Sequence, residues 1–261
     1  MPRALRIALT GWAFFLFFVG SPLIGLVLLP LARLAAPSAA VHRARCTRWI
    51  GAAHRVFWGW MRMSGLVTGR PGAVPLPELP TGGAYVMVTN HPTLIDVILL
   101  LGSYEGLTCV VKGSWYRSIV LGPLLRQTDY LAGPGSGRPE SEDMLGTMVS
   151  HLRGGHPLLV FPEGTRSLAD RMHRFRRGAV EAAVRAGVPV VALFLDVDPP
   201  FLMKGMPFWR VPPRAARFRV ERLDVVSTEG LGPDDARALN ESLQARFQAR
   251  FDAARAARAA A

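Results

Sequence analysis

An uninterrupted apolar segment near the N-terminus most constrains what this chain can fold into. From Ile7 to Ala32 the sequence reads IALTGWAFFLFFVGSPLIGLVLLPLA and contains no charged residue. This segment exceeds the roughly 20 residues that cross a bilayer core, and it is about twice as long as the apolar part of a cleaved signal peptide. Pro22 lies at its middle, where proline kinks or breaks a helix. The sequence therefore predicts a protein at a membrane, and leaves open whether the segment spans it or is re-entrant.

A second stretch, from Trp49 to Val67, mixes aromatic residues with arginines. Such a mixture is typical of a helix in the headgroup region, and equally of a helix packed on a protein core. If the first segment spans, the positive-inside rule places the main domain on the cytoplasmic face of the inner or plasma membrane. The rule rests on the arginines that follow the segment outnumbering those that precede it: Arg33, Arg43, Arg45, Arg48 and Arg55 against Arg3 and Arg6.

The charge of the chain points to anionic partners. Lys and Arg number 31 against 19 Asp and Glu, a formal net charge of +12, which favours nucleic acid, phosphate groups or an anionic membrane surface. The chain has no helix-turn-helix, zinc or aromatic RNA-binding signature, and its N-terminus is apolar, so no nucleic acid is expected. The two cysteines, Cys46 and Cys109, exclude a disulfide scaffold and lack zinc-site spacing. We expect neither a metal nor a cofactor.

The remaining chain alternates between strands and helices. We expect a membrane-associated helical segment at 1–70, a Pro- and Gly-rich linker at 71–83, and an α/β domain at 84–261 that includes a C-terminal helix. The predicted strands are 84–89, 107–111, 157–161, 188–195 and 217–226, and the predicted helices are 115–125, 140–153, 178–186 and a long C-terminal one. Strands that are apolar throughout predict a mostly buried, mixed or parallel sheet flanked by helices.

The first of these strands is followed by the heptapeptide Asn90-His91-Pro92-Thr93-Leu94-Ile95-Asp96. Asn90 suits a helix cap and Pro92 a first helical turn. On a regular helix His91 and Asp96 would point about 140° apart, so they meet only if His91 precedes the helix and folds back. That geometry would give a base held in one tautomer by a carboxylate; a structural hydrogen bond is the alternative. With no Ser or Cys fixed nearby as nucleophile, direct attack by an activated substrate hydroxyl is the simpler mechanism.

A second polar motif, Phe161-Pro162-Glu163-Gly164-Thr165-Arg166-Ser167, follows another strand. Pro162 and Gly164 predict a tight turn with exposed backbone, and the guanidinium of Arg166 suits phosphate. A run of basic residues follows, of which Arg171 and Arg174 fit a solvated face. The motif therefore predicts an anion site.

Together these motifs resemble the glycerolipid acyltransferase family, which includes the 1-acylglycerol-3-phosphate (lysophosphatidate) acyltransferases. Its Asn-His-four residues-Asp block is matched by Asn90, His91 and Asp96, and its Phe-Pro-Glu-Gly-Thr-Arg-Ser block by Phe161 through Ser167. A following Phe-basic-basic-Gly is matched by 175–178, and an apolar Val-Pro-Val-Val strand by 188–191. The resemblance covers roughly residues 84–226.

The resemblance implies a membrane-bound enzyme that moves a fatty acyl group to a lipid hydroxyl. The donor would be acyl-CoA or acyl carrier protein, and the acceptor a lysolipid, 1-acylglycerol-3-phosphate first. His91 would be the general base and Asp96 its orienting carboxylate. Further residues would bind the substrates: Glu163, Gly164, Thr165, Arg166, Lys112 and Arg177.

Departures from the family pattern leave the acceptor open. Gly133 stands where a further block commonly has Arg, which predicts weaker phosphate binding and a gain from Gly133→Arg unless Arg126 or Arg138 takes that role. The alternatives are another acceptor, such as an amino-acid lysolipid or an aryl polyene or related pigment lipid, and a non-catalytic lipid-binding relative.

Overall fold

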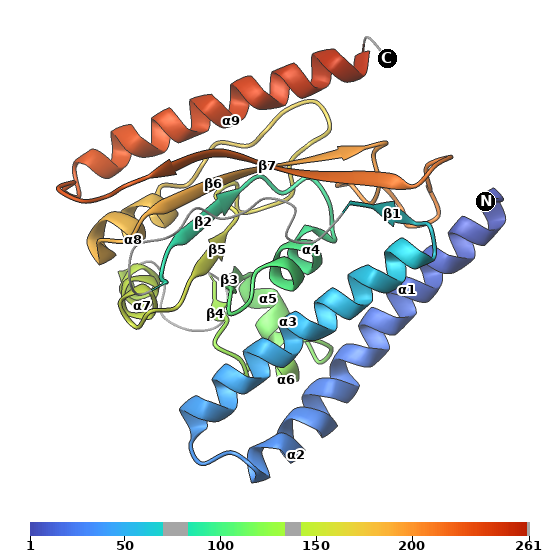
Figure 1. Cartoon of the computed structure of the whole chain (residues 1–261), viewed down its shortest axis with the longest axis horizontal. Coiled ribbons are helices and arrows are strands. Elements are labelled where there is room, and N and C mark those ends of the chain that lie inside the picture. The colour runs from blue at the N-terminus through green and yellow to red at the C-terminus, as the bar shows by residue number, and fades with distance from the viewer. Residues whose placement is uncertain (70–82, 134–141, 260–261) are drawn as a thin grey trace.

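In the computed structural model of the chain, residues 1–69, 83–133 and 142–259 are described. Within them lies a seven-stranded sheet of order β1-β7-β6-β2-β5-β3-β4 (Figure 1). Only β6 and β7 are antiparallel neighbours; the other neighbouring pairs are parallel. The bounds are β1 Val67–Thr68, β2 Val86–Thr89, β3 Thr108–Val111, β4 Leu131–Ala132, β5 Leu158–Val160, β6 Val190–Asp198 and β7 Ala216–Val226. The predicted mixed α/β fold is confirmed.

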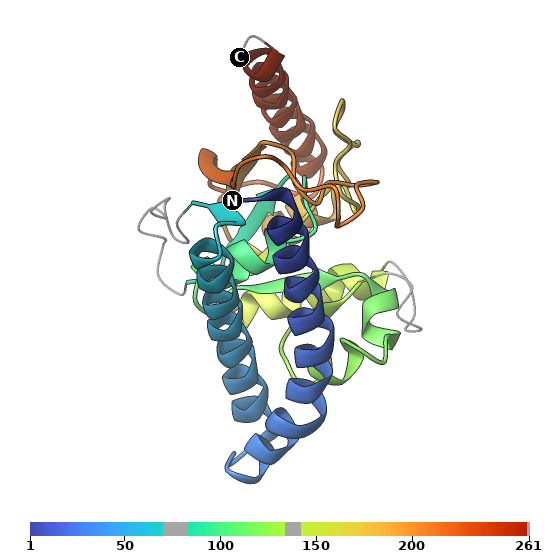
Figure 2. The same cartoon turned by 90° about the vertical axis from the view of Figure 1, so that its right-hand side faces the viewer.

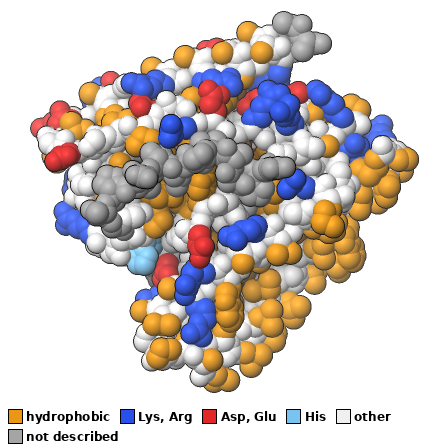
Figure 3. All heavy atoms as spheres, in the orientation of Figure 1, with side chains coloured by type: hydrophobic (Ala, Val, Ile, Leu, Met, Phe, Trp, Pro, Cys, Tyr) orange, Lys and Arg blue, Asp and Glu red, His pale blue; other side chains and the backbone are white. Residues whose placement is uncertain are grey.

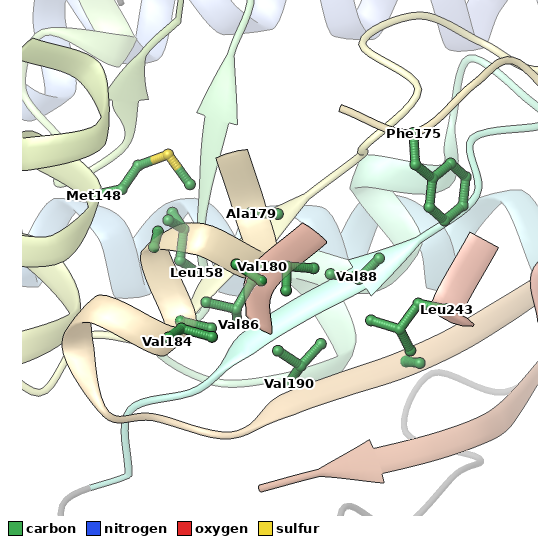
Figure 4. Close-up of a cluster of buried hydrophobic side chains, with 14 of the residues drawn as sticks. Val86, Val88, Met148, Leu158, Phe175, Ala179, Val180, Val184, Val190 and Leu243 are labelled. Carbon is green, nitrogen blue, oxygen red and sulfur yellow. The ribbon is translucent and has the colours of Figure 1, made fainter. Parts of the chain in front are cut away.

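The central strand β2 is buried on both faces, because its successive side chains enter two different cores. Val86 and Val88 pack with α7 (Glu142–Arg153), α8 (Gly178–Ala186) and α9 (Asp235–Ala259) on one face (Figure 4). Met87 packs on the other face with α4 (Asp96–Ser103) and α6 (Gly122–Leu125). Layers of helices on both faces explain why the strands read as apolar runs rather than as alternating patterns.

Two long helical segments lie side by side and antiparallel against the domain (Figure 2). The first is a continuous helix made of α1 (Arg3–Leu23), a π-helical turn (Ile24–Leu28) and α2 (Leu29–Leu34). Of the two expected effects of Pro22, a kink or a break, no break occurs, because Pro22 lies inside α1. The π turn follows instead, and Gln127 Nε2 donates to the Gly25 carbonyl oxygen at 2.6 Å.

This N-terminal helix is long and apolar enough to cross a membrane, and only 17% of its most apolar window is buried in the protein. It nevertheless lies along the domain: Phe14 meets Phe208 and Phe17 meets Phe57, with ring centroids 5.6 and 6.3 Å apart. The helix therefore has one face on the protein and one face free.

The antiparallel partner is α3 (Ala39–Met63), which packs on the core and also exposes apolar side chains, so its place among lipid headgroups stays a prediction. Trp58 and Met61 are fully buried in the core, whereas Val56 and Met63 are 73% and 89% exposed. The chain then enters the sheet as β1, so the segment before residue 70 is joined to the α/β domain by a strand as well as by packing. The predicted linker lies outside the described residues apart from Gly83, and the division into domains stays a prediction.

One predicted helix, 115–125, is instead two short helices, α5 (Gly113–Arg117) and α6. Ser118 between them is extended, with ψ 136°, and Pro123 lies at the start of α6. In contrast, α8 has the predicted bounds. It ends at Gly187, whose φ of 69° lies in the left-handed region that glycine tolerates.

Candidate active site

The two polar motifs meet at one edge of the sheet. β2, β5, β3 and β4 are parallel neighbours, so their carboxyl ends lie along the same edge, where α/β folds place reactive side chains. The segments that leave the strands there begin with Asn90, Phe161, Lys112 and Gly133. Strand order alone thus brings the Asn90–Asp96 segment (the histidine block) next to the Phe161–Ser167 segment (the arginine block).

His91 and Asp96 form a direct contact at this edge. Nδ1 of His91 lies 2.9 Å from Oδ2 of Asp96, because His91 lies in the turn before α4 and Asp96 is the first residue of that helix. The carboxylate is fully buried, while the imidazole keeps 18% of its side-chain surface exposed. The ring also stacks on Phe161, with centroids 4.1 Å apart. The pair thus has the geometry of a fixed base with its other nitrogen, Nε2, available for a substrate.

Thr93 also holds the carboxylate of Asp96, a role that sequence reasoning missed. Its backbone N–H donates to Oδ2 at 2.7 Å, and its hydroxyl donates to Oδ1. Thr93 is itself fully buried. Asp96 therefore accepts three hydrogen bonds, which fix the plane in which its carboxylate can meet the imidazole.

Asn90 is not the helix cap that the sequence suggested. Its side-chain amide pairs with the backbone of Leu195 on β6, donating at 2.8 Å and accepting at 2.7 Å. Pro92 likewise precedes the helix rather than lying in its first turn, since α4 begins at Asp96. The side chain of Asn90 thus binds the end of β2 to β6 and fixes the position of the backbone just before His91.

The Phe161–Ser167 segment is a tight turn, as predicted, with Gly164 at φ 68°. Glu163 lies inside it and is 4% exposed. Its carboxylate accepts from the His91 N–H at 3.3 Å, the Ser167 hydroxyl at 2.5 Å and the His173 N–H at 2.8 Å. The prediction that Glu163 itself holds the acceptor is therefore revised: its oxygens are used by the turn, and it positions the histidine block against the arginine block.

The cations nearest this turn are Arg166 and Arg176. Arg166 is half-buried and donates from Nη1 to the Leu202 carbonyl oxygen at 3.2 Å. Arg176 lies over the turn, since a Cβ added at Gly164 would come within 3.1 Å of its guanidinium carbon. Both blocks are also joined directly, because the Ser167 N–H donates to the His91 carbonyl oxygen at 2.8 Å. The histidine and two guanidinium groups thus belong to one constellation.

The other predicted site residues differ in their placement. Gly164 and Thr165 are exposed at the tip of the turn, and Lys112 is exposed after β3, at the same sheet edge. Arg177 is not brought to the turn. Its side chain is 69% exposed and lies 3.6 Å from Glu181 on α8, so Arg176 replaces it as the basic residue beside Gly164.

Chemically, the constellation combines a base with a cationic turn. It offers an oriented imidazole to accept a proton and guanidinium groups to hold an anion. Among the described residues no cluster of three metal-ligating side chains exists. The arrangement fits acid–base chemistry on a substrate that carries a phosphate.

Comparison with known proteins shows which family the sequence resembles. Residues 75–196 match the family Acyltransferase. The chain is similar to 1-acyl-sn-glycerol-3-phosphate acyltransferase alpha of Mus musculus, 30% identical over 184 residues, which cover 64% of this chain and 58% of that protein. It is also 30% identical over 133 residues to the chloroplastic 1-acyl-sn-glycerol-3-phosphate acyltransferase LPAT1 of Arabidopsis thaliana, covering 48% of this chain and 34% of that one. The chain thus spans little more than half the length of the first of these relatives.

The fold has a close counterpart among solved structures. The crystal structure of the 1-acyl-sn-glycerophosphate (LPA) acyltransferase PlsC from Thermotoga maritima matches with a TM-score of 0.70 and 18% identity, over 98% of both chains. The match includes the N-terminal helices as well as the α/β domain, and it shows that the fold is shared along the whole chain.

Proposed function

The chain belongs to the acyltransferase family through its residues 75–196, and on this premise we propose that it transfers a fatty acyl group from an acyl thioester to a lipid hydroxyl. The observation that carries the proposal is the buried Asp96 carboxylate on Nδ1 of His91, placed beside a turn with two arginines. The first acceptor to test is 1-acylglycerol-3-phosphate, which is the substrate class named for the relatives.

The mechanism follows from the tautomer that Asp96 selects. With its proton on Nδ1, His91 presents the lone pair of Nε2 to the acceptor hydroxyl. As the hydroxyl oxygen attacks the thioester carbonyl carbon, its proton passes to Nε2, and the resulting imidazolium is stabilised by Asp96. The tetrahedral intermediate then expels the thiolate, which takes the proton back from Nε2. The acyl group moves in one displacement, without a covalent acyl-enzyme.

Arg166 and Arg176 would hold the phosphate of the acceptor. A guanidinium binds two phosphate oxygens at once, and the turn fixes where that phosphate lies relative to His91. Gly133 at the same edge adds no charge. This absence is the observation that favours a second candidate, an acceptor with a less charged or bulkier head.

A membrane location is proposed on the N-terminal helices. Large apolar side chains are exposed along α1 and α2, and hydrophobic surface gathers on this side of the molecule in Figure 3. The opposite face of α1 is bound to the domain. The N-terminal helix would therefore lie in the membrane surface with its free face in the acyl region, rather than cross as a separate span. The predicted cytoplasmic face depended on a spanning helix, so this arrangement lends it no support.

The decisive experiment is thioester-dependent acyl transfer by the detergent-solubilised full chain. We expect acyl-CoA or acyl carrier protein to acylate 1-acylglycerol-3-phosphate, and His91→Ala to lower turnover by about 10²–10⁴-fold while the melting temperature stays near that of the parent. Near-normal turnover in His91→Ala would contradict the mechanism. If the chain acylated only another lysolipid, the proposed acceptor would be wrong, and the proposed mechanism would stand.

A further inference from the structure

A hollow of about 300 Å³ lies between α3 and the loop that joins α4 to β3. It is lined from one side by residues 45–55 of α3 and from the other by residues 101–107. The active site lies where α4 begins, at Asp96, whereas this hollow lies where α4 ends. Most of its α3 residues are exposed, so the hollow opens to the surface of the molecule.

Three arginines, Arg45, Arg48 and Arg55, face one carboxylate, Glu105, in the lining of this hollow. Within the parts of the chain that the structure describes, none of the three forms an ion pair. The lining therefore holds more positive than negative charge, with no internal partner to neutralise it. Such a site attracts an anion.

Two of these guanidinium groups are held in place by the backbone. Arg55 donates from Nε to the Gly102 carbonyl oxygen at 3.0 Å, and Arg45 donates from Nη1 to the Ala35 carbonyl oxygen at 3.3 Å. Each tether uses one of the five donors of the guanidinium and leaves the others free. Arg48 has no hydrogen-bond partner among the described residues. The hollow is thus partly pre-organised for a ligand with several acceptor oxygens.

The exposed apolar side chains of α3 indicate that this ligand comes from a membrane. Trp49, which also lines the hollow, is 48% exposed, and Val56 and Met63 follow it at seven-residue intervals with 73% and 89% exposure. They form one apolar stripe on α3, and basic side chains lie along the helix beside hydrophobic ones (Figure 3). Apolar side chains beside arginines and a tryptophan are typical of a helix at the level of the lipid headgroups.

We propose that this hollow binds the phosphate of an anionic phospholipid from the membrane on which the protein lies. The lipid would be a bound anchor and not the acyl acceptor, because its phosphate sits at the far end of α4 from His91. The inference rests on the membrane association proposed above and is independent of acyl transfer. Its chemistry is that of two or three guanidinium groups around one phosphate.

The test is titration of the detergent-solubilised full chain with a short-chain, water-soluble phosphatidylglycerol, compared with Arg48→Gln. Because the Arg48 side chain has no hydrogen bond or ion pair to lose among the described residues, the variant should have the melting temperature of the parent. We expect its affinity for the lipid to fall about tenfold, as for a lost charge-assisted hydrogen bond. Arg48→Lys, which keeps the charge without the planar fork, should recover part of the affinity.

The matched control is Arg62→Gln, an equal loss of charge on the exposed surface of α3 outside the hollow. It should bind the lipid like the parent, and short-chain phosphatidylcholine should bind more weakly to both. Equal weakening by Arg62→Gln would show diffuse charge attraction and overturn the proposal.

Two further ligands separate the sources of the phosphate. If Arg48→Gln weakened the binding of coenzyme A and left the lipid unaffected, the hollow would belong to the acyl donor. If inorganic phosphate bound as tightly as the lipid, the site would be one for a free anion. Either result would overturn the proposal. Turnover of 1-acylglycerol-3-phosphate without added phosphatidylglycerol should be the same in Arg48→Gln and the parent, so inactivity of the parent would count against the proposed function alone.

Discussion

His91 and Asp96 touch although five positions separate them, because the chain between them does not become helical until Asp96 itself. Thr93 makes this possible: it turns the chain and donates both its N–H and its hydroxyl to the same carboxylate. The contact is thus set by the residues between the pair as much as by the pair.

The hydroxyl of Thr93 can be removed with little change in shape. In Thr93→Val, Asp96 keeps the backbone bond and loses the hydroxyl bond. We expect kcat to fall about tenfold, the worth of one hydrogen bond to a charged group, with the acceptor KM unchanged. Thr93→Ser should restore most of the rate. Asp96→Asn should lower kcat further, because an amide can hold the wrong tautomer. A Thr93→Val enzyme with parental kcat would show that the hydroxyl serves folding alone.

The arginines Arg166, Arg176 and Arg177 are expected to separate by function. Arg166→Ala should raise the acceptor KM about ten- to a hundredfold, as expected for lost hydrogen bonds to a charged group, and change the donor KM little. Arg176→Ala should act in the same direction. Arg177→Ala is the matched control, since its side chain is exposed beside Glu181, and it should leave both constants unchanged. If Arg166→Ala changed only the donor KM, the turn would bind the donor phosphates instead.

The gain expected from Gly133→Arg on sequence grounds is not supported by the structure. A Cβ at Gly133 would lie 3.0 Å from the Val111 carbonyl oxygen and 3.2 Å from Val110 Cγ1, while the Gly133 N–H donates to the same carbonyl at 2.7 Å. Even Gly133→Ala should therefore destabilise the fold, by about 1–3 kcal/mol, as measured by denaturant unfolding. Gly146→Ala is the control. It lies on α7 with nothing within 4 Å, so the better helix former should stabilise by up to about 1 kcal/mol.

The half-buried His151 makes stability depend on pH. Burial lowers the pKa of His151 to about 4, with a further lowering by His156. The unfolded chain, with its ordinary pKa near 6.5, binds this proton first, so stability is full above about pH 6.5 and is lost as the pH falls from there towards 4. Unfolding free energies at neutral and mildly acidic pH should show a shallower dependence in His151→Gln. An unchanged slope would assign the pH dependence to other groups, including the buried His54.

Local patterns predicted much of the fold. The sequence indicates where α8 ends, because its run of helix-forming residues stops at Gly187, which takes the left-handed conformation. It also marks the strands, which are apolar on both faces. The split at Ser118 had only a partial signal: Pro123 marks the start of α6, but nothing in the sequence shows that Ser118 is extended.

The site was predictable where one block of sequence contained it. His91 with Asp96, and the turn around Gly164, are such blocks. Long-range contacts were not predictable: nothing near Asn90 points to Leu195, and nothing near Arg166 points to Leu202. The choice between Arg176 and Arg177 had a local signal. Glu181, four residues after Arg177, offers that arginine a partner along α8 and draws its side chain away from the Phe161–Ser167 segment.

The π turn at Ile24–Leu28 leaves one carbonyl without a helical partner. The Leu29 N–H goes to the Ile24 oxygen, and residue 30 is a proline without an N–H, so the Gly25 oxygen is met by Gln127 from the domain. At the other end of α1, Arg6 donates to the Gly65 carbonyl oxygen at 3.2 Å. Hydrogen bonds to the domain thus hold α1 near its N-terminal end, at Arg6, and just beyond its C-terminal end, at Gly25. If a bilayer takes up the free face of this helix, as proposed, the sheet edge that carries His91 would be held at a constant depth and tilt relative to the membrane surface.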